Sequence, residues 1–396
     1  LNALFTTNLS EQLNFFVGYR GLRSLGSYIN ELSSNGNFKI GGSYDSKGNR
    51  YFLRSHITVQ DIMNQENGGV VNLDLFESSE DPYNSRERLN VYSRDGKSLF
   101  KGIRTFLEHK FKFNKSTENE IWLKHKFYYE YKTNQFEQND LVTYESDIAY
   151  FGNSYKGSIN DKVRFKNFYN KVGLAYKSNT LGELTFNVDH TTFDYFYNST
   201  VVSSSGTYIP SEMNYDLVTV GGAYEINKEK FLLNAEARQS ISNVSLTEIK
   251  GMINYLPTSE IKVKAGYHFL SKIPDMTQQM FQSSYVNYNW LNNFSNEKIQ
   301  SLTATVENPI VDVSANFQVI NDKIYFSNNV TSLDENGSPI MQLVTPKQYG
   351  KTIGYFNIKA QKEIKFGKFA LDNKVMFQQV SQDENIVNVP SFLTRN

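Results

Sequence analysis

Apolar and polar side chains alternate with a period of two along most of the chain, and no segment shows a convincing helical period over several turns. In residues 260–270, EIKVKAGYHFL, every second position from Ile261 to Phe269 is apolar, and the positions between them carry Lys262, Lys264 and His268. Because successive side chains of a strand point to opposite faces, this pattern predicts a strand with one apolar and one basic face. The same pattern occurs in residues 13–21, 121–132, 231–238 and 310–319. His125 interrupts the apolar set of its segment, and we expect it near a strand end.

Strand length and loop length both favour a membrane protein. Several alternating segments run roughly 10–15 residues, whereas soluble strands average about 5–6 and tilted membrane strands need about 9–11. Short polar turns are expected at 46–49, 114–119, 178–183, 227–230, 257–260, 295–298, 321–322 and 367–368. Longer connections are expected at roughly 23–36, 62–98, 133–163, 197–212, 272–282 and 331–349, with 244–247 and 308–309 as unusually short members of this second set.

Alternation of short turns with long external loops is typical of outer-membrane barrels. We therefore predict an all-β fold, a transmembrane antiparallel up-and-down β-barrel with about 18 strands visible, as a single domain over residues 1–396. The longest external loops would be 62–98, 133–163 and 331–349.

The directions of the first and last strands predict a barrel that is incomplete at both ends. A first strand near 2–9 would run toward the short turns, and a last strand near 368–381 would run away from them. Single-chain bacterial barrels have an even number of strands with the short turns in the periplasm, so both termini would be periplasmic, unlike these. The final residues, VPSFLTRN, also lack the pattern of a terminal strand with an aromatic end. We expect these two strands not to form a complete ladder with each other.

Composition narrows the function further. Among the 396 residues are 29 Phe and 26 Tyr, and tyrosine suits an interface where one end of the ring is dry and the other is wet. Lys and Arg together number 41, as do Asp and Glu, which argues against a nucleic-acid partner because such binders usually carry a basic excess. The chain has no cysteine, which excludes cysteine catalysis, disulfides and thiolate metal sites.

The sequence contains no recognisable catalytic or metal-binding motif. Its five histidines, at 56, 109, 125, 190 and 268, show no pair at i,i+2 or i,i+4 of the kind that metal ligands form. Hydrolase and phosphate-loop motifs are also missing from the sequence. We therefore predict that the protein is not an enzyme and that it needs no cofactor.

Charged residues opposite the apolar positions are the candidate functional residues. A Lys facing lipid near the bilayer midplane costs about 2–4 kcal/mol, so these side chains should point into a water-filled barrel. The predicted pore-lining residues are Lys124, Lys126, Glu130, Lys171, Glu236, Lys262, Lys264, His268 and Asp312. With both signs of charge present, the lumen would be only mildly selective. A solvated sheet face in a soluble protein would show the same alternation.

The longest connection offers a second candidate. Residues 74–97 carry clustered charges, and loops longer than about 12–15 residues are usually functional or disordered. One interpretation is a loop folded into the lumen, where its charges form a selective constriction. The other is an external surface loop. The constriction residues would be Glu77, Glu80, Asp81, Arg86 and Arg88.

Two stretches, RGLRSLGSYIN (20–30) and NRYFLRSHITVQDIMNQENGGV (49–70), resemble the putative porin family of Bacteroidota outer membranes. The matching positions are Arg23, Ser24, Gly26, Gln60, Asp61, Asn67, Gly68 and Gly69, followed by the acidic DLFESSEDP (74–82). Residues 102–113, GIRTFLEHKFKF, also fit the pattern. The motifs cover about 100 residues, and the resemblance implies an outer-membrane barrel more firmly than any substrate. Family members carry an N-terminal extension and further C-terminal strands.

These observations predict a porin of a Gram-negative outer membrane, in contact with lipid, that lets small polar solutes diffuse passively through a charged aqueous lumen. One alternative is a non-conducting outer-membrane barrel that acts as a partner in assembly or secretion. A second alternative is a soluble all-β surface binding protein.

Overall fold

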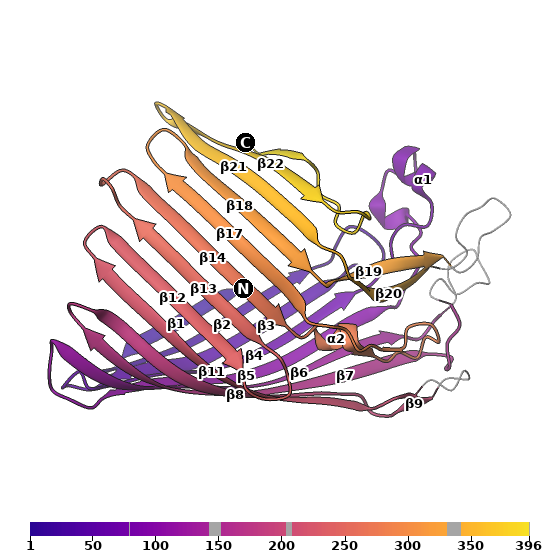
Figure 1. The fold of residues 1–396 in the computed structure, drawn as a ribbon. Coiled ribbons are helices and arrows are strands. Elements are labelled where there is room, and N and C mark those ends of the chain that lie inside the picture. Colours follow the sequence, from indigo (N-terminus) through magenta and orange to yellow (C-terminus); the bar gives the residue numbers. More distant parts are fainter. Residues whose placement is uncertain (79, 142–151, 203–207, 331–341, 396) are drawn as a thin grey trace.

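Seventeen antiparallel strands form one large curved sheet in the computed structural model, which describes residues 1–78, 80–141, 152–202, 208–330 and 342–395 (Figure 1). The strands are β1 (Asn2–Asn8), β2 (Leu13–Ser24), β3 (Ser33–Asp45), β4 (Tyr51–Gln65), β5 (Lys97–Lys112), β6 (Asn119–Gln138), β7 (Ile159–Ser178), β8 (Gly182–Phe196), β11 (Glu212–Lys228), β12 (Phe231–Ser240), β13 (Thr247–Tyr255), β14 (Lys262–Lys272), β17 (Glu297–Glu307), β18 (Asp312–Asn321), β21 (Ile353–Phe366), β22 (Phe369–Ser381) and β23 (Phe392–Arg395). Each strand pairs with its neighbours in chain order, as an up-and-down sheet requires.

Shorter elements lie in the long connections. They are α1 (Leu73–Ser78), η1 (Arg86–Arg88), β9 (Val201–Val202), β10 (Tyr208–Ile209), α2 (Met276–Gln279), β15 (Met280–Phe281), β16 (Trp290–Leu291), β19 (Lys323–Val330) and β20 (Gln342–Tyr349). Among the described residues, no helix has the length and apolar character needed to cross a membrane.

The two faces of the sheet differ as the alternation predicts. Lys171 on β7 lies opposite Lys126 on β6 and Asp189 on β8, so these charges share one face. The Nζ of Lys171 also lies 3.6 Å from Oε1 of Glu236 on β12, although β8 and β11 run between them. Neighbouring strands are about 4.8 Å apart, so side chains separated by three such steps meet only on a concave face. The charged face is therefore the concave one.

The convex face is apolar. Val172, Leu174, Phe186 and Val188 point away from the charged face and are each about half exposed. Apolar side chains in these positions suit contact with lipid. On a soluble protein they would form an unusually large exposed apolar surface. The structure thus confirms the all-β, membrane-barrel type of fold predicted from the alternation.

Short and long connections lie at opposite ends of the strands, but two predicted turns are wrong. Glu297 and Lys298 begin β17, so residues 295–298 end a long connection and do not form a short turn. Residues 321–322 join β18 to the β19–β20 hairpin, which belongs to the long-loop end. Residues 308–309 were expected among the long connections, and this is also wrong: residues 308–311 link β17 to β18 at the short-turn end. Polar composition alone therefore does not show at which end of the strands a connection lies.

The two edges of the main sheet are β1 and β23. Residues 392–395 form a short strand against β22, and this strand ends at Arg395, not at an aromatic residue. In the described part of the chain β1 pairs with β2 alone, and β22 pairs with β21 and β23, so the expected missing ladder between β1 and β22 is confirmed.

Candidate functional site

A network of ion pairs crosses the concave face from β7 to β14. The Asp189 carboxylate is 2% exposed and lies 3.8 Å from Nζ of Lys171 and 3.9 Å from Nη1 of Arg238. Arg238 Nε also donates to Glu248 at 2.6 Å. Glu248 in turn accepts from Lys250 at 2.6 Å and lies 3.0 Å from Nε2 of His268. A carboxylate without partners would be too costly to bury, and the two cations together with the Thr219 hydroxyl, which donates to Asp189, permit this burial.

The structure places all nine predicted pore-lining residues on the concave face of their strands. Lys171 and Glu236 contact each other, and His268 joins the same network through Glu248. The other members pair separately: Lys124 with Glu183, Lys126 with Glu108, Glu130 with Arg104 and Lys132, and Lys264 with Glu307. Lys262 lies opposite Glu307 in the strand register, and Asp312 accepts a hydrogen bond from the Asn308 amide. Their role in conduction stays a prediction.

The charged loop over residues 74–97 packs on itself and on the residues that flank it. The Arg86 guanidinium lies 4.0 Å from the centre of the Phe76 ring, within the same loop. Leu89 and Val91 are buried, and Val70 and Val91 form a β-bridge. In Figure 1, α1 stands beyond the ends of the strands on the long-loop side. A constriction made by Glu77, Glu80, Asp81, Arg86 and Arg88 stays a prediction.

A different connection lies against the concave face. Residues 273–296, between β14 and β17 and here called the inserted segment, contact β7 at Asp161. The Asp161 carboxylate accepts hydrogen bonds from Ser283 Oγ at 2.7 Å, the Ser284 amide at 2.8 Å and Ser284 Oγ at 2.6 Å. One carboxylate thus fixes two successive residues of the inserted segment to the wall.

Further contacts hold both sides of that anchor. Tyr285 donates from its hydroxyl to Oε1 of Gln138 at 2.8 Å, and Tyr215 on β11 donates to Oε1 of Gln279 at 2.7 Å. Met280 is fully buried in an apolar cluster with Tyr195, Tyr197 and Ile209. The inserted segment therefore combines a buried apolar anchor with directional hydrogen bonds to strands far away in the sequence.

Burial changes the acidity of two tyrosines at this contact. It raises the pKa of Tyr285 to about 12, and the nearby Asp161 carboxylate acts in the same direction. Burial likewise raises the pKa of Tyr197 to about 12. Both hydroxyls therefore stay protonated at neutral pH, and the Tyr285 hydroxyl can donate to Gln138.

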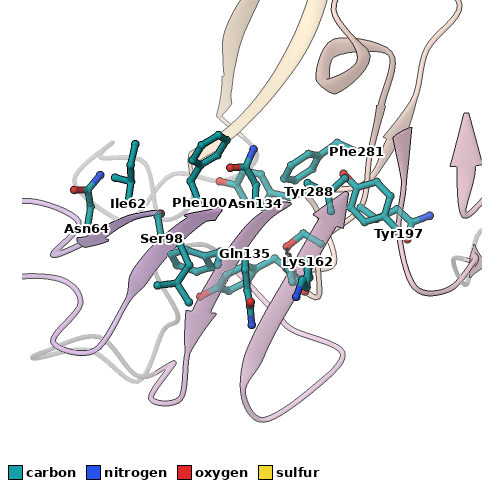
Figure 2. A pocket seen from close by; sticks show the side chains of 17 residues that line it. Ile62, Asn64, Ser98, Phe100, Asn134, Gln135, Lys162, Tyr197, Phe281 and Tyr288 are labelled. Carbon is teal, nitrogen blue, oxygen red and sulfur yellow. Dashed lines mark hydrogen bonds between the residues drawn. The ribbon is translucent and has the colours of Figure 1, made fainter. Parts of the chain in front are cut away.

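A cavity of about 380 Å³ lies between the inserted segment and the wall (Figure 2). From β4 to β7, its lining includes Asn64, Ser98, Phe100, Asn134 and Phe136. The opposite side is built from Tyr197 and from the segment residues Phe281, Gln282, Tyr285 and Tyr288. Figure 2 shows the Gln135 and Lys162 side chains pointing away from the side of the sheet on which Phe100 and Asn134 lie. The cavity is therefore aromatic and amide-rich.

The inserted segment is not among the sites predicted from the sequence, because those sites were identified by their charged residues. In residues 273–296, Asp275 is the only charged residue, and the rest is rich in Asn, Gln, Ser and aromatic residues. Amides and hydroxyls can be buried against a wall when each finds a partner, whereas charges favour water. A long connection of this composition was the available signal. The sequence pattern predicts only a loop over 272–282 and a separate turn over 295–298 in this region.

The histidines are divided between the two faces. His125 lies in the middle of the apolar stretch of β6, not near a strand end as expected, and its ring lies 2.8 Å from that of His109 and 2.8 Å from Oδ1 of Asn170. His190 contacts Asp216 on the same convex face. On the concave face His56 stacks on Phe106. The described residues contain no group of three or more side chains suited to hold a metal ion.

Comparison with known proteins supports an outer-membrane assignment. The family model for a putative porin matches residues 1–396. The siderophore receptor PirA from Acinetobacter baumannii is similar in structure, with a TM-score of 0.64 at 13% identity over 99% of this chain and 61% of that one. The copper transporter OprC is also similar in structure, with a TM-score of 0.64 at 11% identity over 98% of this chain and 62% of that one.

A ferric enterobactin receptor mutant from Pseudomonas aeruginosa gives a TM-score of 0.61 at 9% identity, over 95% of this chain and 58% of that one. At such identities these likenesses concern the fold alone. The chain spans about 60% of the length of these structures. No curated protein matches it.

Proposed function

The chain belongs to the putative porin family, and from this premise we propose that it forms a passive diffusion channel for small polar solutes. Family membership places the protein in the outer membrane of a Gram-negative bacterium, among transport barrels. The finer assignment, a passive channel that does no chemistry on its solute, is our proposal.

The ion-paired concave wall is the observation that carries this proposal. Lys171, Glu236 and Lys250 remain partly exposed while they form ion pairs, Lys171 with Glu236 three strands away and Lys250 with Glu248 on the same strand, β13. Side chains of this kind need water beside them, because a dry interior would impose a large desolvation penalty on each. A barrel with 16–18 strands is wide enough for an aqueous channel. Solutes would then be selected by size and by the charges of the wall.

The inserted segment supports the same mechanism. It lies against the concave side of β6 and β7, held through Asp161 and Gln138, so it occupies part of the cross-section of the path. Its neutral lining narrows the path without adding fixed charge there. The charged network of Lys171, Asp189 and Arg238 would then set ion preference, while the inserted segment sets the size limit.

Single-channel recording of the full-length protein in planar bilayers tests the proposal. We expect stepwise ohmic conductance and, in a salt gradient, a small reversal potential because the wall carries both charges. Lys264→Ala should shift that potential toward cation preference, since one positive charge leaves the wall. A correctly folded protein that never conducts would instead support the role in assembly or secretion. A protein that does not enter bilayers would support the soluble alternative.

A further inference from the structure

The cavity beneath the inserted segment has a lining that specifies a class of ligand. Phe100 and Phe136 supply rings from the wall, and Phe281 and Tyr288 supply rings from the segment (Figure 2). The lining also includes the amides of Asn64 and Asn134 and the hydroxyl of Ser98. Pockets of about 300–1,000 Å³ with apolar walls and a few placed polar groups are typical of small-molecule sites. At about 380 Å³ this cavity falls within that range.

The polar groups of the wall are available to a ligand. In the described part of the chain, the side chains of Asn64, Ser98 and Asn134 have no hydrogen-bond partner. A purely apolar ligand would displace water from these groups and leave them unpaired, which is unfavourable. The occupant should therefore carry hydroxyl or similar groups around an otherwise apolar surface.

One fixed charge lies at the cavity, on a carboxylate whose oxygens already have partners. Asp161 is the charged side chain that reaches it from the concave face, and its oxygens already accept three hydrogen bonds from Ser283 and Ser284. Lys162 points to the other side of the sheet. An anion would be repelled by this carboxylate, and a cation would have to compete with the serine groups for its oxygens, so either would lose hydration for little return. An uncharged ligand fits this site better than an anion or a cation.

We propose that this cavity binds the ring of an uncharged saccharide, which would make the channel selective for neutral sugars. A pyranose ring presents C–H groups on its faces and hydroxyls around its rim. The C–H faces would lie on Phe100 and Phe281, and the rim hydroxyls would reach Asn64, Ser98 and Asn134. This inference rests on the proposed function, because it names the solute class of that channel.

Current block by added sugar tests the proposal on the full-length protein in planar bilayers. Maltose should reduce the current in a saturable way. Sorbitol, an open-chain polyol, should reduce it only in proportion to viscosity, and glucuronate should not saturate because it is charged. Equal, non-saturating effects of maltose and sorbitol would overturn the saccharide site while leaving the pore intact.

Matched variants place the effect in the cavity. Phe100→Ala should raise the half-blocking maltose concentration about tenfold, the order of loss expected when one stacking ring is removed. Phe106→Ala is the control, because Phe106 lies on the same strand and the same face but outside this cavity. Asn134→Ala should raise the half-blocking concentration by about fivefold through loss of one hydrogen bond. An equal effect of Phe100→Ala and Phe106→Ala would contradict the assignment.

Calorimetric titration of the refolded protein with maltose separates this proposal from the proposed function. Saturable heat that weakens in Phe100→Ala but not in Phe106→Ala supports the site even if no conductance is found. Absence of saturable heat in the unsubstituted protein rejects the site, whether or not the protein conducts.

Discussion

Replacing Asp161 by alanine should release part of the inserted segment from the wall. The carboxylate accepts three hydrogen bonds, from Ser283 Oγ, the Ser284 amide and Ser284 Oγ. Bonds to a charged acceptor contribute about 1.5–3 kcal/mol each. Asp161 is only partly buried and the serine groups regain water on release, so the lower limit applies, about 4–5 kcal/mol for three.

Two consequences can be measured. A loss of about 4 kcal/mol corresponds to nearly a thousandfold faster local opening, so amide exchange at Val286, which donates to the Asn153 carbonyl, should accelerate by that order. Single-channel conductance should rise because the path widens. Met280 and its apolar cluster remain, so the change should be confined to residues near 281–288.

The matched control for amide exchange at Val286 is Asp312→Ala. Asp312 is a carboxylate on the same concave face, but it accepts from the Asn308 amide at the short-turn end. Asp161→Asn, which keeps the size of the side chain and one acceptor, should fall between the two. If Asp161→Ala leaves both exchange at Val286 and conductance unchanged, the inserted segment is not held by this contact and does not narrow the path.

Three further outcomes are expected. Val263→Arg should destabilise the bilayer-inserted protein by about 2–4 kcal/mol if Val263 lies near the midplane, whereas Lys264→Ala should barely change unfolding in urea; equal effects would contradict the assignment of faces. Asp189→Ala should leave Lys171 and Arg238 without a shared partner and shift the reversal potential toward anions; an unchanged potential would place this network away from the ion path. Because the pKa of Tyr285 is raised from 10 to about 12, its stabilising contribution is present below pH 10 and is lost as pH rises toward 12. Amide exchange at Val286 should therefore accelerate over that window more in the unsubstituted protein than in Tyr285→Phe, and equal acceleration would show that this hydroxyl does not control the contact.

The alternation was enough to predict the sheet, because the side-chain period of a strand is a local property. The opposed faces of residues 121–132 and 260–270 follow directly from it. Long connections were harder, since their partners lie far away in sequence: Ser283 and Asp161 are separated by 122 residues. No period or motif encodes that contact. The position of His125 was missed for a related reason, because its partners His109 and Asn170 stand on neighbouring strands.

The concave wall and the inserted segment should respond differently to electrolyte. The Debye length falls from about 8 Å at physiological ionic strength to about 3 Å at 1 M. Dissolved salt will therefore mask the partly exposed Lys171–Glu236 pair and its neighbours. The Met280 cluster and the Tyr285–Gln138 hydrogen bond are uncharged and should be almost indifferent to salt. In concentrated brine the protein would become a plain molecular sieve, which has lost its preference for the sign of an ion but keeps the same cut-off in solute mass.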